Sequence, residues 1–210
     1  RIGIVGANGA GKTTLVKLLT GEIEPDTGKV NRAKTLTGII IDQQRKLMQP
    51  EKQVRDVLAD GSDWIDVRGV RKHVQGYLKE FLFEPSLIEA RVGTLSGGER
   101  SRLLLAREFA RPSNFLVLDE PTNDLDVETL SSLEDALLDF PGCAVVTSHD
   151  RWFLDRIATH ILAWEGTDEK PGNWFWFEGN FASYEANKIE RLGPEAARPH
   201  RVTHRRLTRD

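Results

Sequence analysis

The stretch from Gly6 to Thr13 has the residue types and the spacing of a phosphate cradle. The pattern G-x-x-x-x-G-K-[ST] is met by Gly6, Ala7, Asn8, Gly9, Ala10, Gly11, Lys12 and Thr13, and Thr14 follows directly. Glycine allows successive backbone N–H groups to turn inward on phosphates, and a helix that starts there adds partial positive charge. In this pattern the lysine reaches the β- and γ-phosphates and the threonine hydroxyl binds Mg²⁺. We therefore predict that Lys12 and Thr13 bind a nucleoside triphosphate with Mg²⁺.

Two adjacent carboxylates, Asp119 and Glu120, follow the apolar run at residues 115–118. Four apolar residues indicate a strand buried on both faces, and ligands bind at the carboxyl ends of such strands in open α/β sheets. Successive side chains of an extended chain point in opposite directions, so the two carboxylates cannot have the same role. We assign Asp119 to Mg²⁺ and Glu120 to the attacking water as general base. The alternative is a charged strand end that simply meets solvent.

A third group is formed by Ser96, Gly97, Gly98 and Glu99, directly before an expected helix. Ser96 and Glu99 have the S-x-x-E spacing of a capping box, which would explain both residues without any ligand. The paired glycines exceed what a cap requires. Together with the Ser96 hydroxyl, their N–H groups could bind an anion at the start of the helix.

These groups must be positioned by strands and helices that alternate along the chain, the pattern of a mostly parallel sheet flanked by helices. We expect strands at residues 2–5, 36–41, 115–118, 144–147, 161–164 and 174–177. We expect helices at residues 13–19, 99–110, 127–138, 151–157 and 181–191. The glycine loop then connects a strand to a helix, and the two carboxylates end another strand.

The segment 51–91 has a helical texture of its own. Spacings of three and four residues predict one helix with an apolar stripe made of Val70, Val74, Tyr77, Leu78, Phe81 and Leu82. We expect a single nucleotide-binding unit over residues 1–192, with a helical lobe inserted at about 51–110. A basic tail is expected at 193–210.

Composition limits the classes of protein that the chain can belong to. It has 210 residues, of which 39% are hydrophobic and 29% charged, an ordinary globular mixture. The net charge of −3 means that contact with nucleic acid would need a local basic patch. Cys143 is the single cysteine, so an intramolecular disulfide is impossible. No apolar run approaches the roughly 20 residues that span a bilayer, so we expect no membrane insertion. The chain opens with Arg1 inside an expected strand, and we expect a longer protein whose missing part lies N-terminal.

The sequence resembles the ABC ATPases, because residues 95–99 read LSGGE, the signature loop of that family. Within the family it is similar to the soluble ABC-F class, and there to the second ATP-binding domain of Uup-like proteins. The residues that carry this likeness are 95–107, 119–126 and 148–151, together with 73–78, 81–83 and 179–188. The resemblance implies an α/β fold of the P-loop NTPase type and Mg²⁺-dependent hydrolysis of ATP to ADP and phosphate.

The resemblance also implies roles for residues outside the first two motifs. Gln43, beside Gln44, looks like the Q-loop glutamine, which senses Mg²⁺ and links the site to the helical lobe. His149 resembles the switch histidine that contacts the γ-phosphate and orients the water. Asp126 resembles the D-loop aspartate at the seam between two ATPase halves. The signature residues Ser96, Gly97 and Gly98 would contact the γ-phosphate held by the opposite half.

ABC-F proteins carry two ATPase domains in one chain, lack a transmembrane domain and act on the ribosome in translation. The resemblance therefore implies a cytoplasmic protein whose partners are a second ABC domain, in the same chain or in a homodimer, and the ribosome or RNA. Family members also stack adenine on an aromatic residue upstream of the glycine loop, in a region that this sequence lacks.

Two alternatives stay open at this point. The chain could be the ATP-binding subunit of a membrane ABC transporter, which would carry the same catalytic motifs. It could instead be an RNA- or ribosome-binding module with weak ATPase activity. A cluster of arginines near the C-terminus could contact RNA phosphates, although a solvated terminus explains it equally well. The cluster comprises Arg191, Arg198, Arg201, Arg205, Arg206 and Arg209.

Overall fold

A computed structural model describes residues 1–41, 49–123, 125–166 and 173–194 of the chain. Its strands are β1 (Ile2–Val5), β2 (Gly38–Ile41), β3 (Trp64–Val67), β4 (Val70–His73), β5 (Phe115–Asp119), β6 (Cys143–Thr147), β7 (His160–Trp164) and β8 (Trp174–Glu178). Its α-helices are α1 (Lys12–Thr20), α2 (Val54–Ala59), α3 (Val74–Glu80), α4 (Gly97–Ala110), α5 (Val127–Leu138), α6 (Arg151–Ile157) and α7 (Phe181–Leu192). Two short 3₁₀ helices are η2 (Pro85–Leu87) and η3 (Val92–Thr94).

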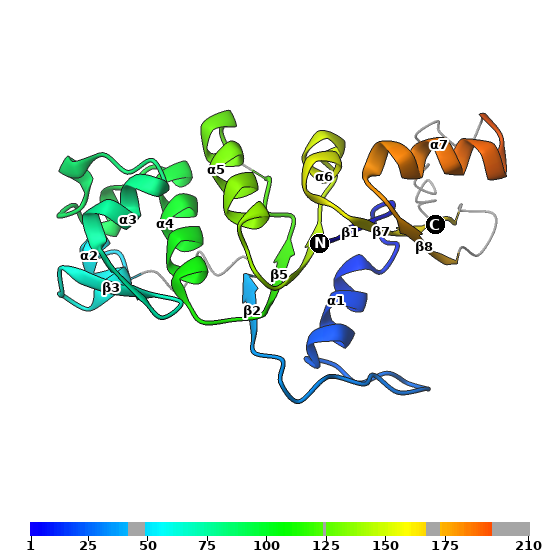
Figure 1. Ribbon diagram of the computed structural model, residues 1–210, viewed down its shortest axis with the longest axis horizontal. Coiled ribbons are helices and arrows are strands. Elements are labelled where there is room, and N and C mark those ends of the chain that lie inside the picture. The colour runs from blue at the N-terminus through cyan, green and yellow to red at the C-terminus, as the bar shows by residue number, and fades with distance from the viewer. Residues whose placement is uncertain (42–48, 124, 167–172, 195–210) are drawn as a thin grey trace, which may run out of the picture.

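The main sheet has six strands in the order β2-β5-β6-β1-β7-β8. All neighbouring strands are parallel except β8, which pairs with β7 in the antiparallel sense. Helices α5, α6 and α7 lie along one face of this sheet, and α1 lies on the other (Figure 1). The predicted fold class, a mostly parallel sheet flanked by helices, is confirmed. The order also separates β1 from β2, which follows it in sequence, and places β6 between β1 and β5.

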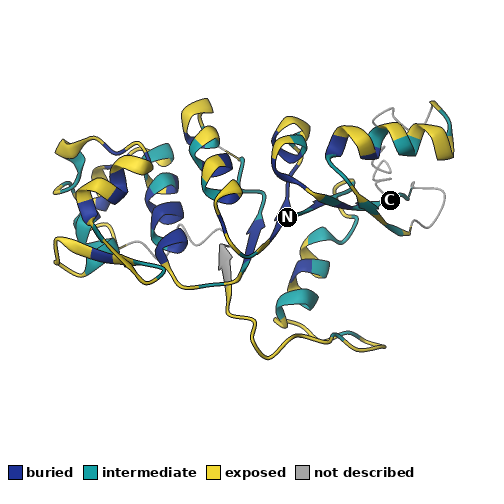
Figure 2. Cartoon of the chain, viewed as in Figure 1, coloured by how far each residue is buried: buried dark blue, intermediate teal, exposed yellow. Residues whose placement is uncertain are grey.

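The central strands are buried because their residues are apolar along the whole strand rather than at alternate positions. Leu116, Val117 and Leu118 of β5 are each no more than 1% exposed, and Val145 and Val146 of β6 are buried as well. Helices on both faces of a parallel sheet favour such continuous apolar runs. Buried residues accordingly concentrate in the central strands and on the helix faces that cover them (Figure 2). This packed core fixes the positions of the strand ends, and the polar loops begin at those ends.

The prediction of one continuous helix through the apolar stripe at residues 70–82 is wrong. Residues 70–73 form β4, which pairs with β3 in a two-stranded antiparallel hairpin. Its turn consists of Arg68 and Gly69, with φ values of 54° and 86°, the left-handed geometry that two-residue hairpin turns require. Only the later part of the stripe is helical, because α3 spans Val74–Glu80 and buries Val74, Tyr77 and Leu78. The remaining predicted strands and helices are confirmed, with ends that differ by at most two residues.

Five of the α-helices begin with a side-chain cap, whereas α1 and α2 do not. The capping residues are His73 of α3, Ser96 of α4, Asp126 of α5, Asp150 of α6 and Asn180 of α7. Each caps by accepting a hydrogen bond from a backbone N–H in the first turn, which satisfies one of the donors left free at a helix start. The N-cap residue of α1 is Gly11, which has no side chain that could accept such a hydrogen bond. The first amides of α1 are therefore available to an external acceptor.

Arg191 belongs to α7 and is not part of a free basic tail. Its guanidinium donates to both oxygens of Glu165, at 3.1 and 2.7 Å, and lies 3.6 Å from the centre of the Phe175 ring. Tyr184 also donates to Glu165, at 3.0 Å. Burial alone would raise the pKa of Glu165, but the hydrogen bonds from Arg191 and Tyr184 outweigh it and lower that pKa. Arg191 thus fastens α7 to the end of β7, and the other five arginines of the predicted cluster lie outside the described residues.

Candidate functional site

One cleft of about 590 Å³ lies at the carboxyl ends of β1, β5 and β6. Parallel strands bring their carboxyl ends to the same edge of a sheet, and these three strands are neighbours there. The loops that follow them therefore converge, although they are far apart in sequence. The cleft is lined by Asn8, Gly9, Gly11, Lys12, Thr13, Thr14, Asp119, Glu120, Asn123 and His149.

The glycines of the first loop serve two different physical needs. Gly9 and Gly11 have φ values of 82° and 87°, and a Cβ built on either would meet no atom within 4 Å. Their backbone conformation, not crowding, therefore requires glycine. At Gly6 the reason is space, because an added Cβ would lie 2.9 Å from Cβ of Trp164. Gly6 thus makes room for Trp164, whereas Gly9 and Gly11 set the turn.

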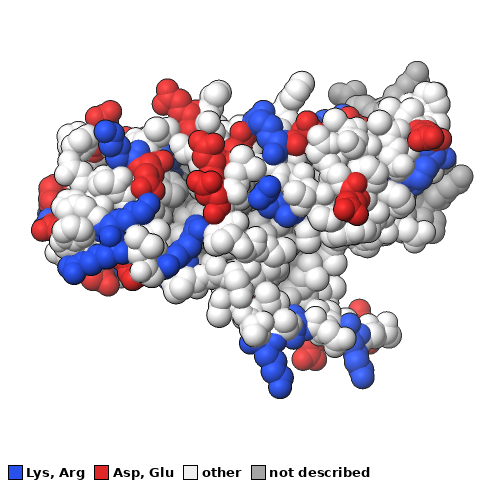
Figure 3. Space-filling view, viewed as in Figure 1, with Lys and Arg blue, Asp and Glu red and all other residues white. Residues whose placement is uncertain are grey.

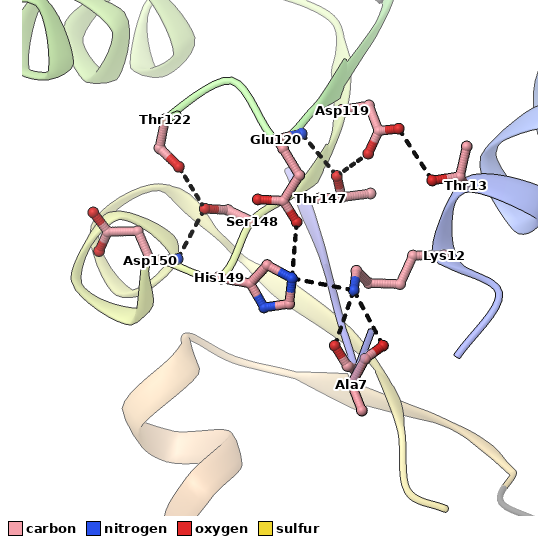
Figure 4. A network of polar contacts seen from close by, with 11 residues as sticks. Ala7, Lys12, Thr13, Asp119, Glu120, Thr122, Thr147, Ser148, His149 and Asp150 are labelled. Atoms are coloured by element: carbon pink, nitrogen blue, oxygen red, sulfur yellow. Dashed lines mark hydrogen bonds and ion pairs between the residues drawn. The ribbon is translucent and has the colours of Figure 1, made fainter. Parts of the chain in front are cut away.

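The Lys12 ammonium lies within the loop that precedes it. Its Nζ donates to the carbonyl oxygens of Gly6 at 3.0 Å and Ala7 at 3.3 Å (Figure 4). It also lies 3.4 Å from Nε2 of His149. These contacts hold one positive charge at the mouth of a loop of backbone amides. Such an arrangement suits a polyphosphate, since both the ammonium and the uncapped start of α1 attract negative charge.

Asp119 is held from two sides by hydroxyl groups. Thr13 donates to Oδ2 of Asp119 at 3.2 Å, and Thr147, the last residue of β6, donates to Oδ1 (Figure 4). Thr147 is fully buried. Asp119 and Thr13 therefore present a carboxylate oxygen and a hydroxyl oxygen to the same point of the cleft. Oxygen atoms of this kind are the ligands that Mg²⁺ prefers in proteins.

Glu120 is presented to the cleft in a strained backbone conformation. Its φ is 47°, in the left-handed region that L-residues rarely adopt, and its N–H donates to the carbonyl and to the hydroxyl oxygen of Thr147 at 3.1 and 2.9 Å. Both carboxylate oxygens are buried, and apart from the contact between Oε1 and His149 neither accepts a hydrogen bond in the described part of the chain. Such strain and such unsatisfied acceptors concentrate at functional sites.

His149 lies opposite Glu120. Its Nε2 is 3.3 Å from Oε1 of Glu120, and its side chain is 54% exposed while that of Glu120 is 18% exposed. One ring nitrogen cannot accept from Lys12 and donate to Glu120 at the same time, so the tautomer of His149 decides which contact is a hydrogen bond. His149 can therefore form a hydrogen bond either with the Lys12 ammonium or with the Glu120 carboxylate.

A second polar cluster lies away from this cleft, where α4 and α5 begin. Ser96 and Glu99 form a reciprocal capping box, in which Glu99 N donates to Ser96 Oγ and Ser96 N donates to Glu99 Oε2. The hydrogen bond from the Ser96 backbone lowers the pKa of Glu99. Asp126 caps α5 through Thr129, and its Oδ2 accepts from Arg102 of α4 at 3.3 Å. The Thr129 hydrogen bonds and Arg102 lower the pKa of Asp126.

The structure places most of the predicted site residues in two groups, whereas Gly6, Ala7 and Ala10 belong to the same loop but do not line the cleft. The cleft contains Asn8, Gly9, Gly11, Lys12, Thr13, Thr14, Asp119, Glu120 and His149. The lining of the cleft does not include Ser96, Gly97, Gly98 or Asp126, and the start of α4 lies apart from α1 (Figure 1). In that second group Gly98 lies beside Asp126, because an added Cβ would be 3.4 Å from its Oδ2. Gln43 and its neighbour Gln44 lie outside the described residues.

Sequence reasoning missed two residues at this site. Asn123 lines the cleft, and Thr147 bonds to both Asp119 and Glu120. Asn123 could have been suspected because it lies within the 119–126 motif. Thr147 ends a strand that reads as ordinary core, and nothing in its neighbours indicates that its hydroxyl reaches another strand.

Comparison with known proteins places these features in a wider context. The family model described as "ABC transporter" matches residues 1–123. The chain is 56% identical over 208 residues to "Energy-dependent translational throttle protein EttA" of Mycobacterium tuberculosis (strain CDC 1551 / Oshkosh), a match that covers 99% of this chain and 37% of that protein. It is 48% identical over 191 residues to "ATP-binding protein Uup-like" of Haemophilus influenzae, covering 90% of this chain and 42% of that protein.

A solved structure with a similar fold is the complex of archaeal ribosomal stalk protein aP1 and archaeal ribosome recycling factor aABCE1. It matches with a TM-score of 0.66 and 30% identity over 89% of this chain and 36% of the solved one. The chain spans well under half of the length of each of these proteins.

Proposed function

Because the chain belongs to the ABC transporter family of ATP-binding domains, we propose that it binds ATP with Mg²⁺ in the cleft and hydrolyses it to ADP and phosphate. The single observation that carries this proposal is the convergence of Lys12, Asp119, Glu120 and His149 in one cleft beside an uncapped helix start. Phosphoryl transfer to water needs little covalent chemistry from the protein. It needs positioned charge and a positioned water, which these four residues can supply.

The donor set at the cleft fits Mg²⁺. Thr13 and Asp119 offer two oxygen atoms 3.2 Å apart, and in the described part of the chain no cluster of three or more His, Cys, Asp or Glu side chains could hold a metal by itself. Mg²⁺ in nucleotide sites typically uses one or two protein oxygens and completes its shell with phosphates and water. We propose Thr13 and Asp119, with Gln43 as a further ligand. When bound, the ion would neutralise charge on the phosphates.

Glu120 is proposed as the general base. Oε2 has no hydrogen-bond donor in the described part of the chain, and Oε1 has only the contact with His149, so a water that donates to Oε2 would remove an unfavourable unsatisfied state. The carboxylate would take a proton from that water as it attacks the γ-phosphate. His149, 3.3 Å away, would orient the water and contact the γ-phosphate, while Lys12 holds the β- and γ-phosphates.

The second cluster supports the proposal that hydrolysis requires two ATPase halves. Ser96, Gly97, Gly98 and Asp126 lie together near the start of α4 but away from the chain's own cleft. These residues could take part in hydrolysis if they contacted the γ-phosphate of an ATP that is bound to a second domain. We propose that the partner is a second ABC domain, in the same polypeptide or in a homodimer.

We further propose that the whole protein is a cytoplasmic ABC-F protein that acts on the ribosome in translation. Support comes from the resemblance of residues 95–107, 119–126 and 148–151 to that class, and from relatives whose names refer to translational throttling and to a Uup-like protein. The domain is proposed to cover residues 1–192, with the lobe at about 51–110 and the tail at 193–210. Among the helices within residues 1–41, 49–123, 125–166 and 173–194, none combines the length and the apolar character that a membrane span needs.

RNA contact does not follow from the charges on the visible face of the domain. There, acidic and basic side chains are interspersed over the lobe and the flanking helices rather than gathered into one basic field (Figure 3). Any electrostatic attraction to RNA would need a local patch, since the net charge of the chain is −3. The arginines at residues 198–209 are the strongest candidates.

The proposal is tested with the longest natural polypeptide that carries this sequence. Phosphate release is measured with ATP and Mg²⁺, and the Glu120→Gln variant is incubated with ATP, sedimented through sucrose and assayed for cosedimenting ribosomes. Mg²⁺-dependent ATPase activity with ribosome association supports both parts. Copurification of a membrane permease instead would identify a transporter subunit, and ribosome binding without ATPase activity would identify a binding module with a degenerate site.

A further inference from the structure

Thr147 occupies the centre of the strand edge from which the proposed catalytic groups emerge. It is the last residue of β6, which lies between β1 and β5. In the register of the sheet it is paired with Asp119 on one side and with Ile4, one residue before the end of β1, on the other. Thr147 is fully buried, although its side chain carries a polar hydroxyl. A buried hydroxyl costs free energy unless it is hydrogen-bonded, so its partners determine what it does.

Both hydrogen-bonding functions of the Thr147 hydroxyl are used within the proposed site. It donates to Oδ1 of Asp119 and accepts from the backbone N–H of Glu120 at 2.9 Å (Figure 4). The hydroxyl therefore bridges the proposed Mg²⁺ ligand and the proposed general base.

The contact with Asp119 restricts the orientation of that carboxylate. With Oδ1 bonded to Thr147, the other oxygen, Oδ2, is the one that lies 3.2 Å from the Thr13 hydroxyl. Rotation of the carboxylate by half a turn would exchange equivalent oxygens, but rotation by less would lose one bond or the other. The two hydroxyls thus hold the carboxylate plane in one orientation across the cleft.

The contact with Glu120 stabilises an unfavourable backbone. A φ of 47° is unfavourable for a non-glycine residue, and such a conformation persists only where surrounding contacts compensate for it. The N–H of Glu120 bonds to both oxygens of Thr147, at 3.1 Å to the carbonyl and 2.9 Å to the hydroxyl. Without the hydroxyl, one of these two acceptors would be lost.

We propose that Thr147 is a positioning residue for nucleotide hydrolysis, whose hydroxyl orients Asp119 toward the cation and secures the turn that presents Glu120. This inference rests on the proposed function. It predicts that removing the hydroxyl weakens the use of Mg²⁺ while leaving the phosphate loop intact, because no side-chain hydrogen bond of the described residues joins Thr147 to Lys12 or to the loop glycines.

The test compares Thr147→Val, which keeps the shape and removes the hydroxyl, with Thr147→Ser, which keeps the hydroxyl. ATP affinity is measured by calorimetry in EDTA and across a Mg²⁺ titration, and ATPase rate is measured across the same titration. Thr147→Val should bind ATP in EDTA like the unmodified protein but need roughly 10- to 100-fold more Mg²⁺ for half-maximal activity, the usual effect of losing a partner of a metal ligand. Thr147→Ser should lie close to the unmodified protein.

Thr122→Val is the matched control. The Thr122 hydroxyl lies 3.0 Å from the Ser148 hydroxyl and so joins the same two chain segments, without touching Asp119 or the N–H of Glu120. Its Mg²⁺ titration should match that of the unmodified protein. If Thr147→Val does not fold, Thr147→Ala and Thr147→Ser form a second pair that differs by the hydroxyl oxygen alone, and the same shift is expected between them.

Each outcome decides the matter. An unchanged Mg²⁺ titration in the hydroxyl-free variants, or an equal shift in Thr122→Val, overturns the role of Thr147 while the proposed ATPase stands. Absence of Mg²⁺-dependent hydrolysis in the unmodified protein, with its partner half present, overturns the proposed function and this inference with it.

Discussion

The Nε2 atom of His149 lies 3.3 Å from Oε1 of Glu120, at the meeting point of the loops that follow β6 and β5. The contact joins an exposed imidazole to a carboxylate whose oxygens are buried. Two side chains so placed can act on one water as a unit, and residues that act as a unit give mutational effects that do not add.

The first prediction concerns this pair. Glu120→Gln should lower ATP turnover by about 100-fold or more, because an amide cannot accept the proton of the attacking water, while ATP affinity stays within a few-fold. His149→Ala should also lower turnover, and adding it to Glu120→Gln should have little further effect. Phosphate release and calorimetric ATP binding check these values. Wild-type turnover in Glu120→Gln would contradict the base assignment, and Glu128→Gln, on the exposed start of α5, is the control.

Removal of the Lys12 ammonium should weaken binding itself. Lys12→Ala deletes the positive charge held at the mouth of the loop, and charge-assisted hydrogen bonds to phosphate contribute about 1.5–3 kcal/mol. The dissociation constant for ATP should therefore rise roughly 10- to 100-fold. Lys17→Ala removes a lysine from the exposed side of the same helix and should leave the affinity unchanged. Equal affinities for Lys12→Ala and Lys17→Ala would argue against the phosphate cradle.

The signature loop should make stability depend on pH in a defined way. The pKa of Glu99 is lowered from its ordinary 4.5, first by the hydrogen bond from the Ser96 backbone. The unfolded chain therefore binds this proton more readily, so the stabilisation by the capping box is complete above about pH 4.5 and is lost as the pH falls through the lowered pKa. Thermal unfolding from pH 3 to 7 should show that Glu99→Gln reduces this dependence. Parallel curves for the two proteins would exclude the contribution.

The anchor of α7 should be sensitive to the geometry of Arg191 rather than to its charge alone. Arg191→Met leaves the Glu165 carboxylate, 10% exposed, without its two-pronged partner. We expect a loss of about 2 kcal/mol, between the values for exposed and buried pairs, and a melting temperature lower by about 4–8 °C.

Lys188→Met is the control for Arg191→Met. It removes a positive charge from the same helix that acts on Glu165 only through space. Its melting temperature should change by much less. An equal decrease in the two variants would mean that the charge alone is responsible and that the hydrogen-bond geometry of Arg191 contributes nothing.

Much of this protein follows from local sequence. The apolar runs at β1, β5 and β6 could be recognised because they are short and continuous, and the helix starts at Ser96 and Gly11 because capping and glycine requirements are local. The site residues that could be predicted each lie beside one of these elements, and their spacing along the chain is one that phosphate binding requires. They are Lys12, Thr13, Asp119 and Glu120. Strand β4 was missed because Val70, its one residue in the apolar stripe, lies four residues before Val74 and so fits the helical spacing.

Tertiary structure decided which strand ends, and which of the loops that follow them, lie next to one another. Pairing of β6 between β1 and β5 places His149 opposite Glu120 and Thr147 beside Asp119, and it leaves Ser96 and Asp126 in a separate cluster. The local pattern of a buried strand is the same whichever strand lies next to it, since its hydrogen bonds join residues far apart in the chain. The sequence by itself therefore determined the groups that handle phosphate, and only the order and register of the strands determined which groups act together.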